Sequence, residues 1–393
     1  MTTTSENGPA VEAVDPATEI DTARGIDPAR EIDTESQIDP VPGLVDDSEG
    51  ASLLVGPHLR SAVMADFRRH VGSVFTGVFA GVLYDQVAYV PVAASVDRTR
   101  RFRDNFTDRA LRSAFTGIPV LVGDAEERAA ASEWLIEQHR PVHGTGVGEY
   151  EGVRYSALDP DLWMWIMAST IHSLLVSFPV ATGRALRPAE AEAAYQYLRY
   201  LFTDLELPSK RSRLPLDYAA FNAYYEDVVT TKLESNGFLR DQFSGLTRLP
   251  LPTIILPPVL RPVVALPWAA IRPLLGRVVQ ICSAQIMHPQ VLEMIGFELR
   301  RRHDWEFAVY SGLLRTAWRA LPDRLRVEPM LYNRLRVEAA REQFDGSARS
   351  RARLRRAERR SDRQRGPLLD FYHRYRLDDF DVPEQYRGGC PMG

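Results

Sequence analysis

Apolar residues recur at helical spacing along most of the chain between residues 59 and 340. They follow mixed helical spacing over residues 59–89. Asp124 stands in front of AEERAAASEWLIEQH, in the position of a helix cap. Asp159-Pro160, Arg187-Pro188 and Pro215 each open a further apolar-periodic segment with proline in the first turn. Because strand signals are sparse, the pattern predicts an all-α fold built as one large helical domain.

Two stretches are apolar enough to need separate consideration. Residues 162–181 come close to the roughly 20 apolar residues of a bilayer span, but they contain His172 and several small polar residues. We therefore predict a buried core helix there and no transmembrane span. Residues 249–273 are also apolar, but prolines recur along them. Because proline interrupts a helix, we predict short helices and extended links in this region.

The two ends of the chain differ from the centre in charge. Residues 1–50 carry 13 acidic side chains against Arg24 and Arg30, in a short repeat that reads EIDTAR, GIDPAR, EIDTES and QIDPVP. Such a segment buries too little apolar surface to offset its ordering entropy, so we predict that it is disordered. Residues 349–365 are rich in arginine with helical character. The predicted organisation is a tail at 1–50, a helical domain at 51–340 and an Arg-rich extension at 341–393.

Composition excludes several classes of protein. Hydrophobic residues make up 45% and charged residues 25% of the chain, which is ordinary for a globular protein. The two cysteines cannot form a disulfide framework. The first residues lack the basic start and apolar core of an export signal, so we expect a cytoplasmic protein. No aromatic residue interrupts Arg349–Arg365, which disfavours nucleic acid as a partner; the oligomeric state stays open.

Three histidines are candidates for chemistry. His139 and His143 are four residues apart and can share a helix face. A zinc pair at this spacing normally encloses a glutamate, whereas Arg-Pro-Val stands here, and capping of the helix end is the simpler interpretation. His172 lies within WMWIMASTIHSLLVSF. A buried imidazole needs partners for its nitrogens, and these are either protein groups in a core or the iron of a haem.

The order of motifs between residues 60 and 310 resembles the MpaB/latex-clearing-protein (rubber oxygenase) family of haem-dependent oxygenases, also known as the DUF2236 family. The similar segments are QVAYVPVAASV at 86–96, RALRS at 109–113, a Gly-Asp turn with H-x-x-V-x-G at 123–144, Y-x-A-x-D-P at 155–160, and W-x-x-A-x-T at 165–170. The chain departs from the family at two positions. Tyr89 and Met167 stand where the family often keeps histidine.

The resemblance implies a globin-like packing of helices, haem b as cofactor, and oxidation of an apolar substrate, isoprenoid-like or a natural product, with O2. It implies catalytic roles at the distal face of the haem for His139, Arg140 and His143, which we expect to face a buried apolar cavity. Iron ligation falls to His172, with Met167 as second choice, and Arg109, Arg112 and Tyr89 are further haem-binding candidates. The alternative is a non-catalytic helical binding protein for a lipid-like ligand or a partner protein, which has lost the haem ligand.

Overall fold

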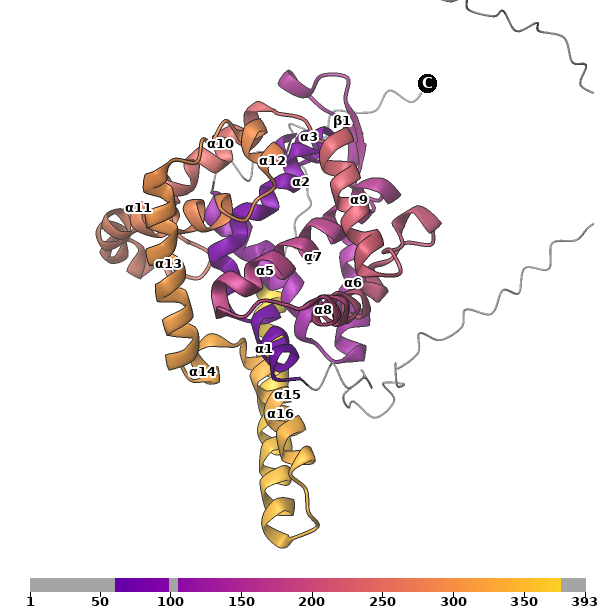
Figure 1. Ribbon diagram of the computed structural model, residues 1–393, viewed down its shortest axis with the longest axis vertical. Helices are drawn as coiled ribbons and strands as arrows, with labels where there is room; N and C mark the ends of the chain where they lie inside the picture. Colours follow the sequence, from indigo (N-terminus) through magenta and orange to yellow (C-terminus); the bar gives the residue numbers. More distant parts are fainter. Residues whose placement is uncertain (1–60, 99–104, 376–393) are drawn as a thin grey trace, which may run out of the picture. The chain divides into compact units, whose positions relative to one another are not determined.

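A computed structural model of the chain describes residues 61–98 and 105–375. These residues belong to one compact unit, residues 43–393, drawn in Figure 1. The predicted disorder of residues 1–50 falls outside the described residues. The predicted boundaries at residues 50 and 340, and the globin-like packing, stay predictions.

The prediction of an all-α fold is confirmed. The amino-terminal half consists of short helices that lead into one long central helix. Its elements are α1 (Ala62–Val71), the 3-10 helix η2 (Val74–Tyr84), α2 (Asp85–Ala88), α3 (Val90–Arg98), α5 (Phe106–Val122), α6 (Ala125–His139), β1 (His143–Thr145), η3 (Gly148–Tyr150), β2 (Arg154–Ser156) and α7 (Pro160–Thr182).

The carboxy-terminal half surrounds that central helix and continues into a helical pair. Its elements are α8 (Pro188–Phe202), η4 (Thr203–Leu205), η5 (Lys210–Ser212), α9 (Tyr218–Thr231), α10 (Gly237–Gly245), η6 (Leu246–Arg248), η7 (Pro258–Leu260), α11 (Arg261–Ala284), α12 (Pro289–Ile295), α13 (Arg301–Ala320), α14 (Asp323–Arg326), α15 (Pro329–Glu342) and α16 (Ala348–Tyr375).

Helix α7 lies at the centre of the unit, packed against α1, η2, α8, α9 and α13 (Figure 1). Its start is fixed by Asp159, whose side chain accepts from two backbone N–H groups, and by Pro160 in the first turn. It ends at Gly183, which adopts a φ of 76° that favours glycine. Most of its side chains are buried, so the predicted core helix is confirmed.

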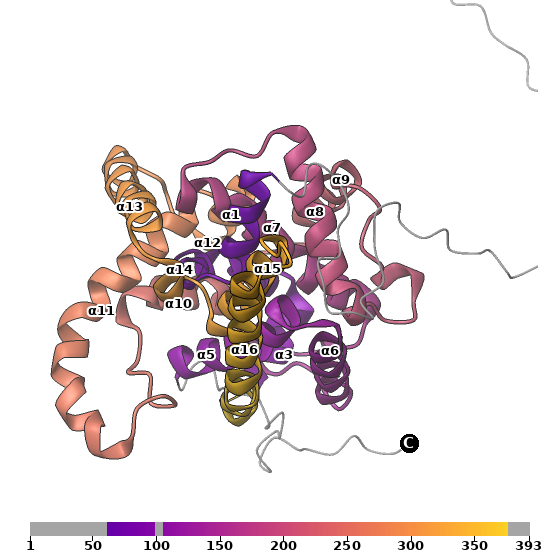
Figure 2. The same ribbon diagram turned by 90° about the horizontal axis from the view of Figure 1, so that it is seen from below.

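Two local features differ from the sequence analysis. Residues 143–156 form a small antiparallel hairpin, β1 with β2, although strand signals in the sequence are sparse. The proline-rich region was expected to break into short pieces, but α11 runs continuously through Pro267 and Pro273. Each of these prolines removes one helical donor, and Figure 2 shows α11 curving along its length. The bend accommodates the rings without ending the helix.

The Arg-rich extension folds as the predicted helix. Helix α16 packs along α15 and against α5. Arg365 anchors it to the start of α6, where its guanidinium lies 2.6 Å from Glu127 Oε1 and 2.9 Å from Asp124 Oδ2. These acids sit at the amino-terminal end of α6 in a capping box. Part of the arginine charge is therefore neutralised within the folded unit.

Candidate functional site

A buried carboxyl group lies against the middle of α7. Asp85, at the start of α2, is fully inaccessible to solvent. Its Oδ1 accepts from the hydroxyl of Ser169 at 2.5 Å and its Oδ2 accepts from the hydroxyl of Tyr225 at 2.8 Å. Burial raises the pKa of Asp85 to about 7, against the two hydrogen bonds, which lower it. Three segments far apart in sequence are joined here by one network.

The raised pKa of Asp85 predicts a pH dependence of stability. The native carboxyl holds its proton up to about pH 7, whereas the unfolded group releases it near pH 4. The native state therefore binds more protons between these values, and the contribution of Asp85 to the unfolding free energy falls as the pH rises, by on the order of 4 kcal/mol. Asp85→Asn, which does not titrate, should remove this slope. Urea unfolding of both proteins at pH 5, 6, 7 and 8 measures the difference, and a constant difference contradicts the prediction.

His172 is stacked face to face on Tyr225. The two rings have a centroid distance of 3.8 Å and an interplanar angle of 11°. Burial, and to a smaller extent the nearby His288, lower the pKa of His172 to about 4, so the imidazole is neutral at pH 7. Within the described part of the chain, neither of its ring nitrogens has a hydrogen-bond partner. His172 is thus a half-buried neutral imidazole whose nitrogens are not used by the fold.

The imidazole of His172 is of the donor type that binds haem iron. Its ligand lone pairs lie in the plane of its ring, whereas stacking on Tyr225 occupies a ring face. The described residues contain no group of three or more His, Cys, Asp or Glu side chains that could hold a metal ion.

Met167 does not share a site with His172. Its side chain is 3% exposed and belongs to the apolar core formed with Trp163, Met164 and Ile171. Five residues of helix separate Met167 from His172, which is about 140° around the axis. His172 instead points toward Tyr225, which belongs to a second apolar cluster. The two side chains therefore lie on different faces of α7 and cannot serve one iron together.

Tyr89 lies nearer the amino-terminal end of α7. It is half-buried between α2 and α3, and burial together with the charges of Asp161 and Asp159 raises its pKa. These two acids stand at the start of α7, some three turns before His172. The structure therefore places Tyr89 with the helix start and away from His172.

The three predicted catalytic residues do not gather at one buried cavity. Arg140 is exposed and forms an ion pair of 2.5 Å with Glu137 on its own helix. His143 is also exposed, at the start of β1. The predicted burial of these two side chains is wrong, because the chain turns outward into the β1–β2 hairpin directly after α6.

His139 alone of the three is turned toward the interior. Its ring meets Trp163 of α7 edge to face, with a centroid distance of 5.3 Å, and its Nδ1–H donates to the carbonyl of Leu135 at 2.8 Å. Burial is the main cause that lowers its pKa to about 4, and the charge of Arg109 adds to it. The structure therefore does bring together two predicted site residues, His139 and Arg109. Arg112 is half-buried on the same helix as Arg109.

Sequence reasoning missed Asp85, Tyr225 and His70. His70 is fully buried, its Nε2 lies 3.0 Å from Ser177 Oγ, and its Nδ1 has no hydrogen-bond partner among residues 61–98 and 105–375. Burial lowers its pKa to about 3. Asp85 directly precedes the segment QVAYVPVAASV, so an acid at the edge of an apolar motif was a usable signal. Nothing in the sequence pairs Tyr225 with His172.

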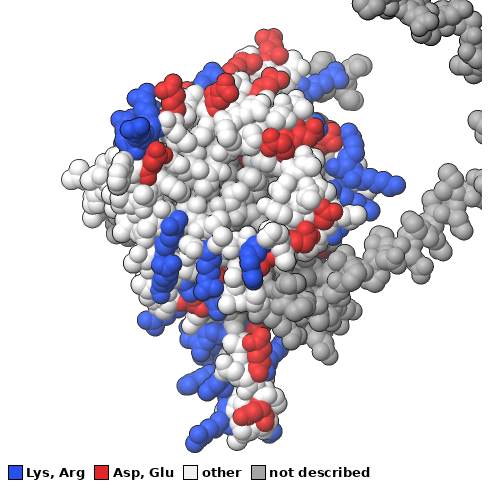
Figure 3. Space-filling view, viewed as in Figure 1, with Lys and Arg blue, Asp and Glu red and all other residues white. Residues whose placement is uncertain are grey.

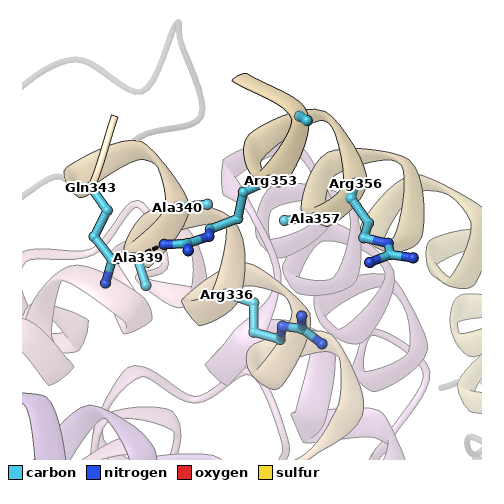
Figure 4. Close-up of a pocket in the computed structure, with 8 residues that line it drawn as sticks. Arg336, Ala339, Ala340, Gln343, Arg353, Arg356 and Ala357 are labelled. Carbon is cyan, nitrogen blue, oxygen red and sulfur yellow. Dashed lines mark hydrogen bonds between the residues drawn. The ribbon is translucent and has the colours of Figure 1, made fainter. Parts of the chain in front are cut away.

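Two hollows of the described residues lie away from His172. One of about 720 Å³ lies between α15 and α16 and is lined by Arg336, Arg353, Arg356 and alanine side chains. Figure 4 shows Arg353 reaching toward Gln343 on α15, and the two side chains are 2.8 Å apart. The other, of about 380 Å³, is lined by Arg277, Arg300, Arg302 and their neighbours. Both are rich in guanidinium groups and neither suits an apolar substrate.

Comparison with known proteins gives one match. The sequence model of the family described as "ER-bound oxygenase mpaB/B'/Rubber oxygenase, catalytic domain" matches residues 66–317. That range includes Asp85, His139, His172 and Tyr225. No curated protein and no solved structure matches the chain significantly.

Proposed function

Because the chain belongs to the ER-bound oxygenase mpaB/B' and rubber oxygenase catalytic domain family, we propose that it is a haem b-dependent oxygenase that oxidises an apolar, isoprenoid-like or natural-product substrate with O2. The observation that carries the haem assignment is His172. It is a neutral imidazole on the central helix, stacked on Tyr225, whose nitrogens have no hydrogen-bond partner among the described residues. When bound through this nitrogen donor, haem supplies the redox-active iron that activates O2.

The Asp85 network holds the imidazole of His172 in place. The hydroxyl of Tyr225 donates to Asp85 Oδ2, and Asp85 is held in turn by Ser169 on the same helix as His172. The hydrogen bond to Asp85 restrains the ring of Tyr225. Because the imidazole of His172 is stacked on that ring, its orientation is restrained as well. The fold thereby orients a ligand nitrogen by packing, where other proteins use a hydrogen bond to the imidazole.

His139 does not take part in the proposed site. Its ring packs on Trp163, which lies nine residues before His172 and so on the opposite side of α7. The neutral ring donates through Nδ1–H to the carbonyl of Leu135. Arg140 and His143 are exposed, so none of the three predicted catalytic residues lies beside His172.

Replacement of His172 tests the haem assignment. His172→Ala is expected to abolish the Soret band of protein produced with ample haem, because the proposed iron ligand is removed. Met167→Leu, which keeps the volume of a core side chain, is the control and should retain the band. Absorption spectra with a pyridine haemochrome assay measure both. A normal Soret band in His172→Ala contradicts the assignment.

One observation favours the alternative, a non-catalytic binding protein for a lipid-like ligand. The two hollows described above do not lie beside His172. The same spectra decide between the two functions, because a wild-type protein that stays colourless with ample haem supports the binding protein and contradicts the oxygenase.

A further inference from the structure

An apolar segment projects from the folded unit between α10 and the buried end of α11. We call residues 249–275 the apolar hook; it consists of an extended arm, η7 and the first half of α11. Figure 2 shows α11 arching away from the other helices. Eight of the nineteen exposed large hydrophobic side chains among the described residues lie in it: Ile255, Val259, Leu260, Val263, Leu266, Ile271, Leu274 and Leu275. Exposed apolar groups this concentrated mark an interaction surface.

The exposed face of the hook is too wide for a flat protein contact. From residue 261 to 273 only Arg261, Val264, Trp268 and Arg272 are half-buried, and every other residue is exposed. Those four lie three or four residues apart, so they form one inward stripe. Everything else around the helix is apolar and open. A protein partner covers one side of a helix, whereas the hydrocarbon of a lipid layer can surround a projecting segment on several sides.

Several backbone carbonyls of the hook are paired within the hook, as a segment in lipid requires. Trp268 Nε1–H donates to the carbonyl of Leu249 at 2.9 Å. The guanidinium of Arg261 donates to the carbonyls of Leu256 and Thr253 at 3.2 and 3.1 Å. Prolines at four positions of the arm and η7, 250, 252, 257 and 258, carry no N–H. The arginine charge is therefore turned inward onto carbonyls, and the outer surface offers apolar groups.

Charge around the hook suits an anionic lipid surface. Residues 242–292 contain four arginines and no aspartate or glutamate. Figure 3 shows the projecting surface as uncharged atoms, with both basic and acidic atoms beside it. Where α11 enters the folded unit, Arg277, Arg300 and Arg302 line the smaller hollow together with Glu298, and Arg277 is paired with Glu306 at 2.6 Å. Apolar groups bordered by arginine are typical of segments that lie in the interface of a membrane.

We propose that the apolar hook inserts into one leaflet of a lipid bilayer and docks the protein on the membrane surface. Helix α7 and the segment Pro258–Ala284 are both long and apolar enough to cross a membrane, but only 6% of the apolar window of the second is buried inside the protein, against 67% for α7. The end of α11 is buried from Gly276 onward among protein groups. The arm is held to α5, where Thr107 donates to the carbonyl of Pro250 at 2.8 Å and Asp108 Oδ1 accepts from the N–H of Ile254 at 3.0 Å. The segment is therefore anchored at both ends, and the exposed part between them enters the lipid from the side.

Flotation with lipid vesicles tests the docking. The full chain is mixed with vesicles of phosphatidylcholine and phosphatidylglycerol and centrifuged through a sucrose gradient. The matched variants are Leu266→Glu in the hook and Leu216→Glu before α9; these leucines are 80% and 74% exposed, and neither is buried in the core. Wild type and Leu216→Glu are expected to float with the vesicles. Leu266→Glu should reduce the bound fraction at least fivefold, because it places a charge in the lipid.

Three results would overturn the proposal. Wild-type protein that stays at the bottom of the gradient excludes docking. An equal loss in both variants shows that the hook is not the contact. Light scattering that finds a wild-type dimer, dissociated by Leu266→Glu and without affinity for vesicles, assigns the hook to a second copy of the chain. Because flotation does not depend on haem or on turnover, its outcome is separate from that of the proposed oxygenase function.

Discussion

Lowering the pH from 7 to 4 is expected to remove most of the stability of the protein. His70, His139 and His172 are held neutral by burial, which lowers their pKa values to about 3, 4 and 4. The unfolded residues titrate near pH 6.5, so the unfolded state binds more protons below that value, and stability is lost as the pH falls from about 6.5 toward 4. The protonation of each group lowers the free energy of unfolding by on the order of 3 kcal/mol at pH 4.

The combined loss from these three imidazoles is comparable to the 5–15 kcal/mol free energy of unfolding of a typical domain. The protonation of Asp85 stabilises the native state as the pH falls, but it offsets only a minority of this loss. Circular dichroism and urea unfolding of haem-free protein between pH 4 and 8 measure the effect.

A pair of variants separates the buried imidazoles from general acid effects. His172→Phe keeps an aromatic ring against Tyr225 but does not titrate, and it should recover on the order of 3 kcal/mol of the acid loss. His143→Gln replaces an exposed histidine and is the matched control for the substitution itself. Identical acid profiles for His172→Phe and wild type would show that the neutral imidazole is not the cause.

Among the glycines that the structure describes, Gly276 is the one where an alanine is expected to be most damaging. A Cβ at Gly276 would lie 1.9 Å from the carbonyl oxygen of Leu246 and 2.8 Å from the Cα of Thr247. Both atoms belong to the backbone of η6, so no side-chain rotation relieves the overlap. The two segments must separate at the point where the apolar hook is anchored, at a cost of at least about 3 kcal/mol.

The matched control is a helical glycine with open space around it. A Cβ at Gly312 in α13 meets no atom within 4 Å, so Gly312→Ala should stabilise the helix by up to about 1 kcal/mol. Thermal or urea unfolding of the two variants measures the contrast. Equal midpoints for Gly276→Ala and Gly312→Ala would contradict the close approach of α11 to η6.

The sequence alone determined the class of the fold and the position of its central helix. The capping signals at Asp159-Pro160 and the long apolar run of α7 are local, and local signals can be read along the chain. The order of motifs from residue 86 to 170 could also be recognised in the sequence, and it indicated the family that the comparison confirmed. Helix geometry also places His172 and Met167 on different faces of the central helix, because five residues correspond to about 140° around its axis.

Tertiary structure decided which of the candidate residues meet. His139 and Arg140 are neighbours in sequence, yet one turns onto Trp163 and the other into solvent, because the chain leaves the helix for a hairpin at that point. The pairing of Asp85 with Tyr225 and of Tyr225 with His172 joins residues that are 140 and 53 positions apart in the sequence. The exposure of the apolar hook could not be predicted from the sequence either. Hydropathy reports which side chains are apolar, whereas burial depends on whether another segment packs over them. No segment of the described residues packs over the outer side of the hook.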